Sequence, residues 1–418
     1  MALPGVGFRF NGSVVNPSTV EQNFIAAADG SEAGSFTFVA VSNGTETIIG
    51  PVTFTQQARN ADTGNAGYVD FIMTGAGDAT FHDLGASVAG GIGGRTDFFY
   101  TGASAEDCTI TNDGATTTGA VGGGTSFSQA KPSAGNATLI ANGGANGGEG
   151  GFFLFVDGSL GGTARLEVFG NGYMEMSTHP GPSLSIGSIE GDGQIYLGKS
   201  TLIVGTNKLS TIFSGVLHPG GSDGSSGTGA LTKTNSGALT LTGANLYTAG
   251  TTVSASMLVI SNNIGSGTGT SAVSVNAATL GGKGIISGAV TMNSGAFLAP
   301  EHGTKTQSTL AIQSALTFNA GSTYTYTFKA KKKQAKTDKV IANGVTIASG
   351  ASFNLSGTTK GTLTSGLVLT VISNTSANPI SGTFSNLADG AIVTVNGNNL
   401  QASYEGGDGN DLTLTVVP

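Results

Sequence analysis

Short stretches in which apolar and polar residues alternate run through much of the chain. In GALTLTGANLYTAGTTV, Gly237–Val253, Leu alternates with Thr, stops at a Gly-Ala-Asn turn and then the alternation resumes. Alternation with a period of two places apolar side chains on one face of a β-strand and polar side chains on the other. The pattern therefore predicts many short strands, each with one buried face.

The composition supports strands and turns rather than helices. Glycine accounts for 70 of the 418 residues, whereas charged residues make up only 10%. Glycine supplies the positive φ angles that tight turns require, and β-branched residues favour strands. Only Asn16–Gly30 has helical spacing, and it predicts one short helix. The expected fold class is therefore all-β.

A repeat of about 28 residues is visible between residues 71 and 182. Phe71, Phe99, Phe127 and Phe155 are equally spaced along the chain at this period. Similar strand-turn-strand pieces lie near them, namely DATFHDLG, DCTITNDG, NATLIANG and TARLEVFG. We expect the four phenylalanines to occupy one equivalent position in successive repeats.

A unit of this size is too small to bury its own apolar face, so successive units must stack on one another. Stacking strands in parallel, about 4.8 Å apart, makes each repeat one coil of a solenoid. A β-sandwich or a propeller would also contain many short strands, but the fixed spacing and the scarcity of hairpin signals favour the solenoid. We predict a right-handed parallel β-helix (β-solenoid) with small antiparallel caps at its ends.

Three regions follow from this pattern. Residues 1–60 are expected to be a strand-rich cap, in which Gly34–Gln57 suggests a small antiparallel unit. Residues 61–383 are expected to form the β-helix. Residues 384–418 are expected to form a cap of three strands joined by Asn-Gly turns. Because exposed edge strands recruit other chains, an incompletely covered end would allow copies to stack into fibres.

Residues 236–300 resemble the autotransporter-associated β-strand repeat of bacterial surface proteins. The matching positions are Gly237, Leu239, Leu241, Gly243, Asn245, Tyr247, Gly250, Thr251 and Val253. Ala249 and Ser256 stand where that family usually has glycine, which affects the turns but not the strand pattern. The resemblance implies a secreted or surface-displayed β-helical stalk, commonly non-catalytic. It therefore implies an extracellular or cell-surface location in bacteria.

The net charge of −8 and the pI near 4.9 disfavour nucleic acid as a partner, because phosphate recognition requires a basic face. The single Cys108 cannot form an internal disulfide. The chain shows no standard signal peptide, so its export route is not visible. The longest apolar run, Phe152–Val156, is far shorter than a spanning helix, and no barrel-length series of strands follows residue 402. We therefore expect no direct membrane insertion.

One segment suggests a metal site. Gly406–Thr415, GGDGNDLTLT, resembles one copy of the calcium-binding glycine-aspartate nonapeptide, in which Asp408 and Asp411 would supply oxygen ligands. A calcium site of that kind needs a second, stacked copy, and the sequence has none. A glycine turn before the last strand is the simpler interpretation.

Patterns that suggest catalysis are weak. Ser222 lies in GGSDG with His218 nearby, but a nucleophile elbow requires a helix after the serine, and a flexible loop follows here. The four histidines have no paired spacing that suggests zinc. Glu167, Glu175 and Glu190 are too dispersed to nominate a glycosidase pair, although coils of a solenoid could bring them together. The histidines are His82, His179, His218 and His302.

The stretch Lys329–Lys339, KAKKKQAKTDK, holds six of the chain's 17 basic residues. It is expected to be a loop or strand end that projects from the solenoid. The simple interpretation is a solvated loop. The functional interpretation is attraction to anionic polysaccharide or to the acidic body of a neighbouring copy.

The sequence thus predicts a non-catalytic extracellular structural or adhesive protein, a stiff surface stalk or fibre-forming subunit. The alternative is a carbohydrate-active enzyme or a carbohydrate-binding module on a β-helix scaffold. No catalytic, metal-binding or cofactor-binding residue is assigned, and no cofactor is expected. The candidate partners are other copies of the chain and cell-surface or extracellular polysaccharide.

Overall fold

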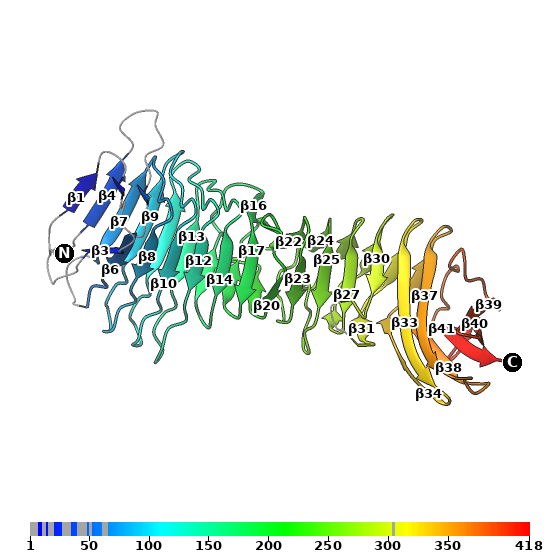
Figure 1. Cartoon of the computed structure of the whole chain (residues 1–418). Coiled ribbons are helices and arrows are strands. Elements are labelled where there is room, and N and C mark those ends of the chain that lie inside the picture. Colours follow the sequence, from blue (N-terminus) through cyan, green and yellow to red (C-terminus); the bar gives the residue numbers. More distant parts are fainter. Residues whose placement is uncertain are drawn as a thin grey trace. The chain divides into compact units, whose positions relative to one another are not determined.

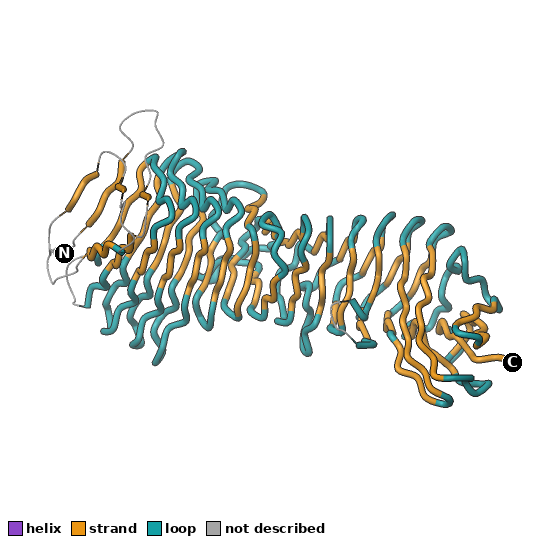
Figure 2. The backbone as a smooth tube through the Cα atoms, viewed as in Figure 1, coloured by secondary structure: helices purple, strands orange, loops and turns teal. Residues whose placement is uncertain are grey.

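The computed structural model describes residues 7–10, 14–15, 21–26, 35–39, 48–49, 52–60, 66–302 and 306–418. The chain divides into two compact units, Met1–Ala230 (unit 1) and Leu231–Pro418 (unit 2). Figures 1 and 2 show strands of each unit lying side by side in successive coils. The regular elements of the described residues are all strands. No described helix is long and apolar enough to cross a membrane.

Unit 1 is built mainly from two stacks of parallel strands. The first stack runs in the order β1-β4-β7-β9-β11-β13-β15-β18-β21. Its strands are β1 (Gly7–Phe10), β4 (Ser35–Val39), β7 (Tyr68–Ile72), β9 (Arg95–Phe99), β11 (Gly124–Ser128), β13 (Phe152–Phe155), β15 (Tyr173–Glu175), β18 (Gln194–Tyr196) and β21 (Val216–His218).

The second stack of unit 1 runs in the order β3-β6-β8-β10-β12-β14-β17-β20. Its strands are β3 (Gln22–Ala26), β6 (Val52–Gln56), β8 (Thr80–Asp83), β10 (Thr109–Asn112), β12 (Thr138–Ala141), β14 (Arg165–Val168), β17 (Ser188–Gly191) and β20 (Thr211–Phe213). Two further parallel pairs are β2 (Val14–Val15) with β5 (Ile48–Ile49), and β16 (Ser183–Ile186) with β19 (Thr201–Val204). Parallel pairing from coil to coil confirms the predicted β-helix.

Two predictions for the N-terminal region are wrong within the described residues. Gln22–Ala26 is a strand rather than part of a helix, and the rest of Asn16–Gly30, apart from Glu21, lies outside the described residues. The strands before residue 60 pair in parallel, β1 with β4 and β3 with β6, so they do not form the expected antiparallel unit. The reason is packing, because Phe24 stacks on Phe54 at 5.2 Å and continues the aromatic core of the later coils.

A stack of phenylalanine rings forms the centre of unit 1. Phe38, Phe71, Phe98, Phe127 and Phe155 occupy one register position, with successive ring centroids 4.9–5.0 Å apart. Such pairs contribute about 0.5–1.5 kcal/mol each beyond their buried area. The stack therefore ties each coil to the next.

The prediction that Phe99 belongs to this stack is wrong. Phe98 pairs with Phe71 and Phe127, whereas Phe99 pairs with Ile72 and Ser128 on the outer face. The successive intervals in the stack are not constant, because the connections between strands differ in length. A shift of one residue reverses the face of a strand.

Unit 2 continues the same architecture with three stacks. The first runs β23-β25-β27-β30-β33, the second β22-β24-β26-β29-β32-β36, and the third β28-β31-β35-β38-β41-β40-β39. The strands of the first are β23 (Ala238–Leu241), β25 (Met257–Ile260), β27 (Thr279–Gly282), β30 (Phe297–Ala299) and β33 (Thr323–Lys331), and β33 also pairs with β34 (Gln334–Thr337) and β37 (Ser352–Lys360). Those of the second are β22 (Ala230–Lys233), β24 (Thr251–Val253), β26 (Val273–Val275), β29 (Val290–Met292), β32 (Leu316–Phe318) and β36 (Val345–Ile347). Those of the third are β28 (Ile285–Ile286), β31 (Thr309–Ile312), β35 (Lys339–Ala342), β38 (Val368–Asn374), β39 (Ile392–Val395), β40 (Asn398–Gly406) and β41 (Asp411–Val417).

The C-terminal part of unit 2 changes from parallel to antiparallel pairing. Strands β39, β40 and β41 form an antiparallel meander, and β41 also pairs antiparallel with β38. The hairpin β33–β34 is antiparallel as well. Antiparallel pairing therefore begins well before residue 384, where the sequence placed the start of the cap.

A ladder of asparagine side chains links three coils of unit 2. The amide of Asn293 donates to Asn276 Oδ1 at 2.7 Å, and that of Asn319 donates to Asn293 Oδ1 at 2.8 Å. Each amide thus satisfies the one on the next coil. Turn residues, as well as core residues, hold successive coils in register.

Candidate functional site: a lysine groove

The basic stretch of unit 2 forms a β-hairpin. Along β33, Tyr324, Tyr326 and Phe328 are buried and the alternate residues face outward, as the period of two requires. The strand turns at Lys332, whose φ is 48°, and returns as β34. The predicted loop or strand end is therefore an ordered hairpin that carries lysines along both strands.

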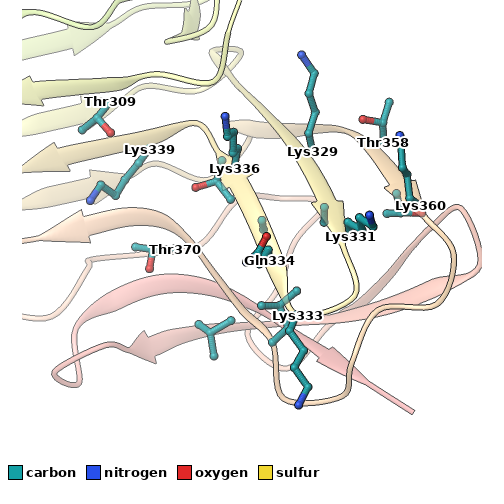
Figure 3. Close-up of a pocket in the computed structure, with 16 residues that line it drawn as sticks. Thr309, Lys329, Lys331, Lys333, Gln334, Lys336, Lys339, Thr358, Lys360 and Thr370 are labelled. Atoms are coloured by element: carbon teal, nitrogen blue, oxygen red, sulfur yellow. The ribbon is translucent and has the colours of Figure 1, made fainter.

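This hairpin forms one wall of an open groove with a volume of about 1080 Å³, called the lysine groove below. Figure 3 shows the lysine side chains arising from several strands around it. Its polar lining residues are Lys329, Lys331, Lys333, Lys336, Lys339, Lys360, Thr309, Gln334, Thr337, Thr358, Thr359 and Thr370. Lys360, from β37, thus joins the five lysines of the stretch Lys329–Lys339 that line the groove.

The strand register sets lysines directly beside one another. Lys331 pairs with Lys360 across the parallel strands β33 and β37, and Lys329 lies opposite Lys336 across the antiparallel hairpin. Like charges in directly opposed positions destabilise a sheet. The arrangement therefore costs stability unless an anion lies nearby.

The lysines of the groove form no salt bridge with the described residues. Within the described ranges, the salt bridges involve Arg165 and not these lysines. Lys329, Lys331, Lys333, Lys336 and Lys360 are exposed, whereas Lys339 is half-buried. Burial raises the pKa of the Asp411 carboxyl, and the positive charge of Lys339 offsets part of this rise. The groove thus presents five exposed ammonium groups to solvent.

The predicted calcium segment forms the turn between β40 and β41. Asp411 Oδ1 accepts a hydrogen bond from the backbone N–H of Asn374 at 2.8 Å, while Asp408 is exposed in the turn. In the part of the chain that the structure describes, no group of three or more His, Cys, Asp and Glu side chains gathers around a possible metal position. The segment forms the glycine turn that the simpler interpretation of the sequence predicts, and calcium binding by Asp408 and Asp411 stays an untested alternative.

Ser222 and His218 are not arranged as nucleophile and base. Ser222 is exposed in a turn, and its backbone N–H donates to Glu175 Oε2 at 2.8 Å. His218 instead contacts Gln194 Oε1 at 2.7 Å and stacks on Tyr196 at 4.6 Å. The residues after Ser222 form no helix. The local geometry of a hydrolase elbow is missing here.

The structure brings together two of the three dispersed glutamates. Glu167 and Glu190 pair in register on β14 and β17, and Arg165 lies beside them. Its Nε is 3.0 Å from Glu167 Oε1 and 2.7 Å from Glu190 Oε1, and the hydrogen bond to Glu190 raises the pKa of the guanidinium. Both carboxylates are thus engaged by an arginine, whereas a glycosidase pair must flank a sugar.

The remaining histidines lie apart from one another. His82 is half-buried on β8, and His302 is exposed in a turn. His179 is buried, with Nε2 3.0 Å from the carbonyl of Ser159 and Nδ1 accepting from the Gly181 N–H at 3.2 Å. Both ring nitrogens of His179 are therefore used in holding backbone turns.

The geometry of the opening segment of unit 2 explains its sequence pattern. Leu239, Leu241, Tyr247 and Val253 are buried, and the hydroxyl of Tyr247 lies 2.6 Å from Thr251 Oγ1. The Asn245 amide donates to the carbonyl of Gly267 at 2.7 Å. Gly237 and Gly250 have φ of 88° and 105°. Each position of the pattern thus fills a core site, bonds a neighbouring coil or permits a turn.

The fold defines the chain as a parallel β-helical repeat protein. Within it, residues 231–260 match the model of the passenger-associated-transport-repeat. This match confirms the resemblance of the segment to repeats of autotransporter passengers. Ser256, where the repeat usually has glycine, has a φ of 55°, which is the conformation that favours glycine.

A crystal structure of the Haemophilus influenzae Hap adhesin is similar to the chain, with 12% sequence identity and a TM-score of 0.40. The similarity covers 98% of this chain and 45% of that one, so the chain spans less than half the length of that protein. No curated protein is significantly similar to the chain.

Proposed function

We propose that the protein is an extracellular, non-catalytic structural and adhesive protein of the bacterial surface. The observation that carries this proposal is the passenger-associated-transport-repeat at residues 231–260, set within a parallel β-helix. Repeats of this type occur in the surface-displayed regions of bacterial proteins. The role of the chain is therefore to extend from a surface and make contacts there.

The mechanism is geometric. In each unit, backbone hydrogen bonds between parallel strands are reinforced by stacked side chains, such as the phenylalanines of unit 1 and the asparagines of unit 2. Such stacking resists bending of each unit. The outward rows of hydroxyl and amide side chains provide many weak contacts, which become strong when they act together. This supports a stiff stalk or a fibre-forming subunit.

The carbohydrate-active alternative has less support. Of the three glutamates that the sequence singled out, Glu167 and Glu190 lie together, and both are bonded to Arg165. Ser222 lacks a contact with His218, which is engaged by Gln194. The non-catalytic structural and adhesive role is therefore the function that the described residues support best.

Surface display combined with electron microscopy tests the proposal. Non-adherent bacteria that display the full chain should attach to coated surfaces more than bacteria that display an unrelated β-helix. Micrographs of the purified chain should show rods or filaments. Release of reducing ends from polysaccharides by the purified chain would contradict the non-catalytic role, and unchanged attachment would contradict the adhesive one.

A further inference from the structure

The charges of the chain are distributed unequally between its two units. Residues 1–230 contain 7 Lys and Arg against 19 Asp and Glu, whereas residues 231–418 contain 10 against 6. Seven of the ten lysines of the second set lie between Lys329 and Lys360. The strongest cationic feature of an acidic protein is thus confined to one part of one unit.

We propose that the lysine groove binds a linear polysaccharide that carries carboxylate or sulfate groups. An anion beside the opposed pairs Lys331–Lys360 and Lys329–Lys336 would relieve their repulsion, because no salt bridge within the described residues does so. Neighbouring strands are about 4.8 Å apart, so lysines on adjacent strands arise close to one another. A single small anion would neutralise only one or two of these lysines, whereas a polyanion contacts several of them.

The side chains show how such a polymer would be held. Figure 3 shows Lys329, Lys336 and Lys360 extending in one direction from their strands, while Lys333 extends away from them at the turn. Lysine is a flexible point charge that accepts several anion geometries, in contrast to the fixed fork of arginine. The hydroxyls of Thr358 and Thr370 add hydrogen-bonding groups suited to sugar hydroxyls.

The lining of the groove disfavours nucleic acid. The described residues that line it include no arginine and no aromatic side chain. Recognition of bases depends on stacking against aromatic rings or on arginine contacts with base edges. The groove therefore offers charge and hydroxyl contacts, which fit a charged sugar chain better than a strand with exposed bases.

A second copy of the chain is a poorer occupant, although unit 1 is acidic. Several of its carboxylates already have partners within their own chain. Glu167 and Glu190 bond Arg165, and Asp107 and Asp113 accept from Asn136 and Asn142 at 3.0 and 2.9 Å. These four carboxylates are therefore less available to the lysines of a second copy.

Binding by the purified full chain tests this proposal. Heparin, as a sulfated probe, and polygalacturonate, as a carboxylate probe, are compared by calorimetry with neutral dextran and with duplex DNA. The test variant is Lys331→Gln with Lys336→Gln and Lys360→Gln. The control variant removes the same charge at exposed lysines outside the groove, Lys131→Gln with Lys199→Gln and Lys283→Gln.

We expect binding to one or both anionic glycans but not to dextran, with at least a tenfold loss in the groove variant and less than a twofold loss in the control. The slope of log affinity against log salt should fall by about 2–3 in the groove variant, because each contact with a polyanion releases roughly one counterion. The sulfated and carboxylate probes then distinguish which anionic group is preferred.

Four results would overturn the proposal: no binding to either glycan, equal losses in both variants, DNA binding as tight as glycan binding, or groove-dependent self-association in sedimentation without glycan binding. The glutamine substitutions lie at exposed strand positions, and a thermal midpoint at or above that of the parent confirms folding. The biological use of the groove rests on the proposed adhesive function. Glycan binding is measured on the purified protein, and attachment is measured on bacteria that display the chain. A failure of glycan binding therefore contradicts the groove proposal without deciding the proposed adhesive function.

Discussion

The ring of Phe98 stacks on that of Phe127 with their centroids 4.9 Å apart, while the adjacent Phe99 lies on the outer face of the same strand. Phe98→Ala should therefore lower the free energy of unfolding of unit 1 by about 3–5 kcal/mol, because it empties a fully buried site in the stack. Phe99→Ala is the matched control and should cost less than about 1 kcal/mol. Urea unfolding followed by circular dichroism measures both, and equal losses would contradict the assigned register.

The turn at Ser256 offers a test of the passenger-type repeat. Ser256 has a φ of 55°, in the left-handed region that glycine adopts without a Cβ penalty. We expect Ser256→Gly to raise the free energy of unfolding of unit 2 by up to about 1 kcal/mol, since the relief of strain outweighs the added freedom of the unfolded chain. Ser254→Gly, at an exposed position without a positive φ, should lower it by about 0.5–1 kcal/mol. The opposite order of the two thermal midpoints would refute this account.

The acidic residues of unit 1 predict greater stability at mildly acidic pH. The buried Asp83 accepts a hydrogen bond from Thr96 Oγ1 at 3.0 Å, and burial raises its pKa well above the ordinary value. Burial, with a further effect of Asp97, raises the pKa of Asp70 from 3.8 to about 7. At a pH between the ordinary pKa and the raised pKa of each carboxyl, the folded state binds more protons than the unfolded state. The stabilisation by these protons is therefore lost as the pH rises.

The thermal midpoint of unit 1 should accordingly fall between pH 5 and pH 8. In Asp83→Asn the fall should be smaller, because the amide does not titrate. Calorimetric scans at several pH values make the comparison. An unchanged pH slope in the variant would show that Asp83 keeps an ordinary pKa in the fold.

Lys233 predicts the opposite dependence for unit 2. Its side chain is buried, and its Nζ donates to the carbonyl of Thr234 at 2.6 Å. Burial lowers the pKa of this lysine from 10.5 to about 8. Between these values the unfolded state binds more protons, so the contribution of Lys233 to stability rises with pH. Relative to the parent, Lys233→Met should lose this rise between pH 8 and 9.5 in urea unfolding, and parallel curves would contradict it.

The repulsion in the lysine groove has a measurable cost in the absence of ligand. Lys360→Gln should raise the thermal midpoint of unit 2 at low salt by the equivalent of a few tenths of a kcal/mol, because it removes the charge directly opposite Lys331. The gain should shrink at 1 M salt, where the screening length is about 3 Å. Lys283→Gln, at an exposed lysine outside the groove, is the control, and an equal gain there would assign the effect to net charge alone.

The alternation of side chains was enough to predict the strands and their stacking. Leu239 and Leu241 are buried, and Thr240 between them is not, as a period of two requires. The assignment of Phe99 failed because a constant interval between repeats was assumed, whereas β7, β9 and β11 are joined by connections of different lengths. A one-residue difference in a turn changes the interval without weakening the repeat.

The candidate site was predicted only in part. The cluster Lys329–Lys339 is evident in the sequence, but its hairpin and its groove are not. Lys360 joins Lys331 because β33 and β37 pair at an offset close to the period of the earlier repeat. A repeat interval of this length, extended to the C-terminal part of the chain, is the sequence signal that could have found Lys360.

The amino-acid sequence by itself determined that the chain forms short strands with one buried face and that successive coils must stack, because the periodicity of apolar side chains and the positions of glycine are local properties. The tertiary structure alone decided which coil lies beside which, and therefore that Phe98 rather than Phe99 joins the stack and that Lys360 reaches the groove. These relationships depend on the lengths of turns and on the register between strands, which are fixed only when the coils pack together.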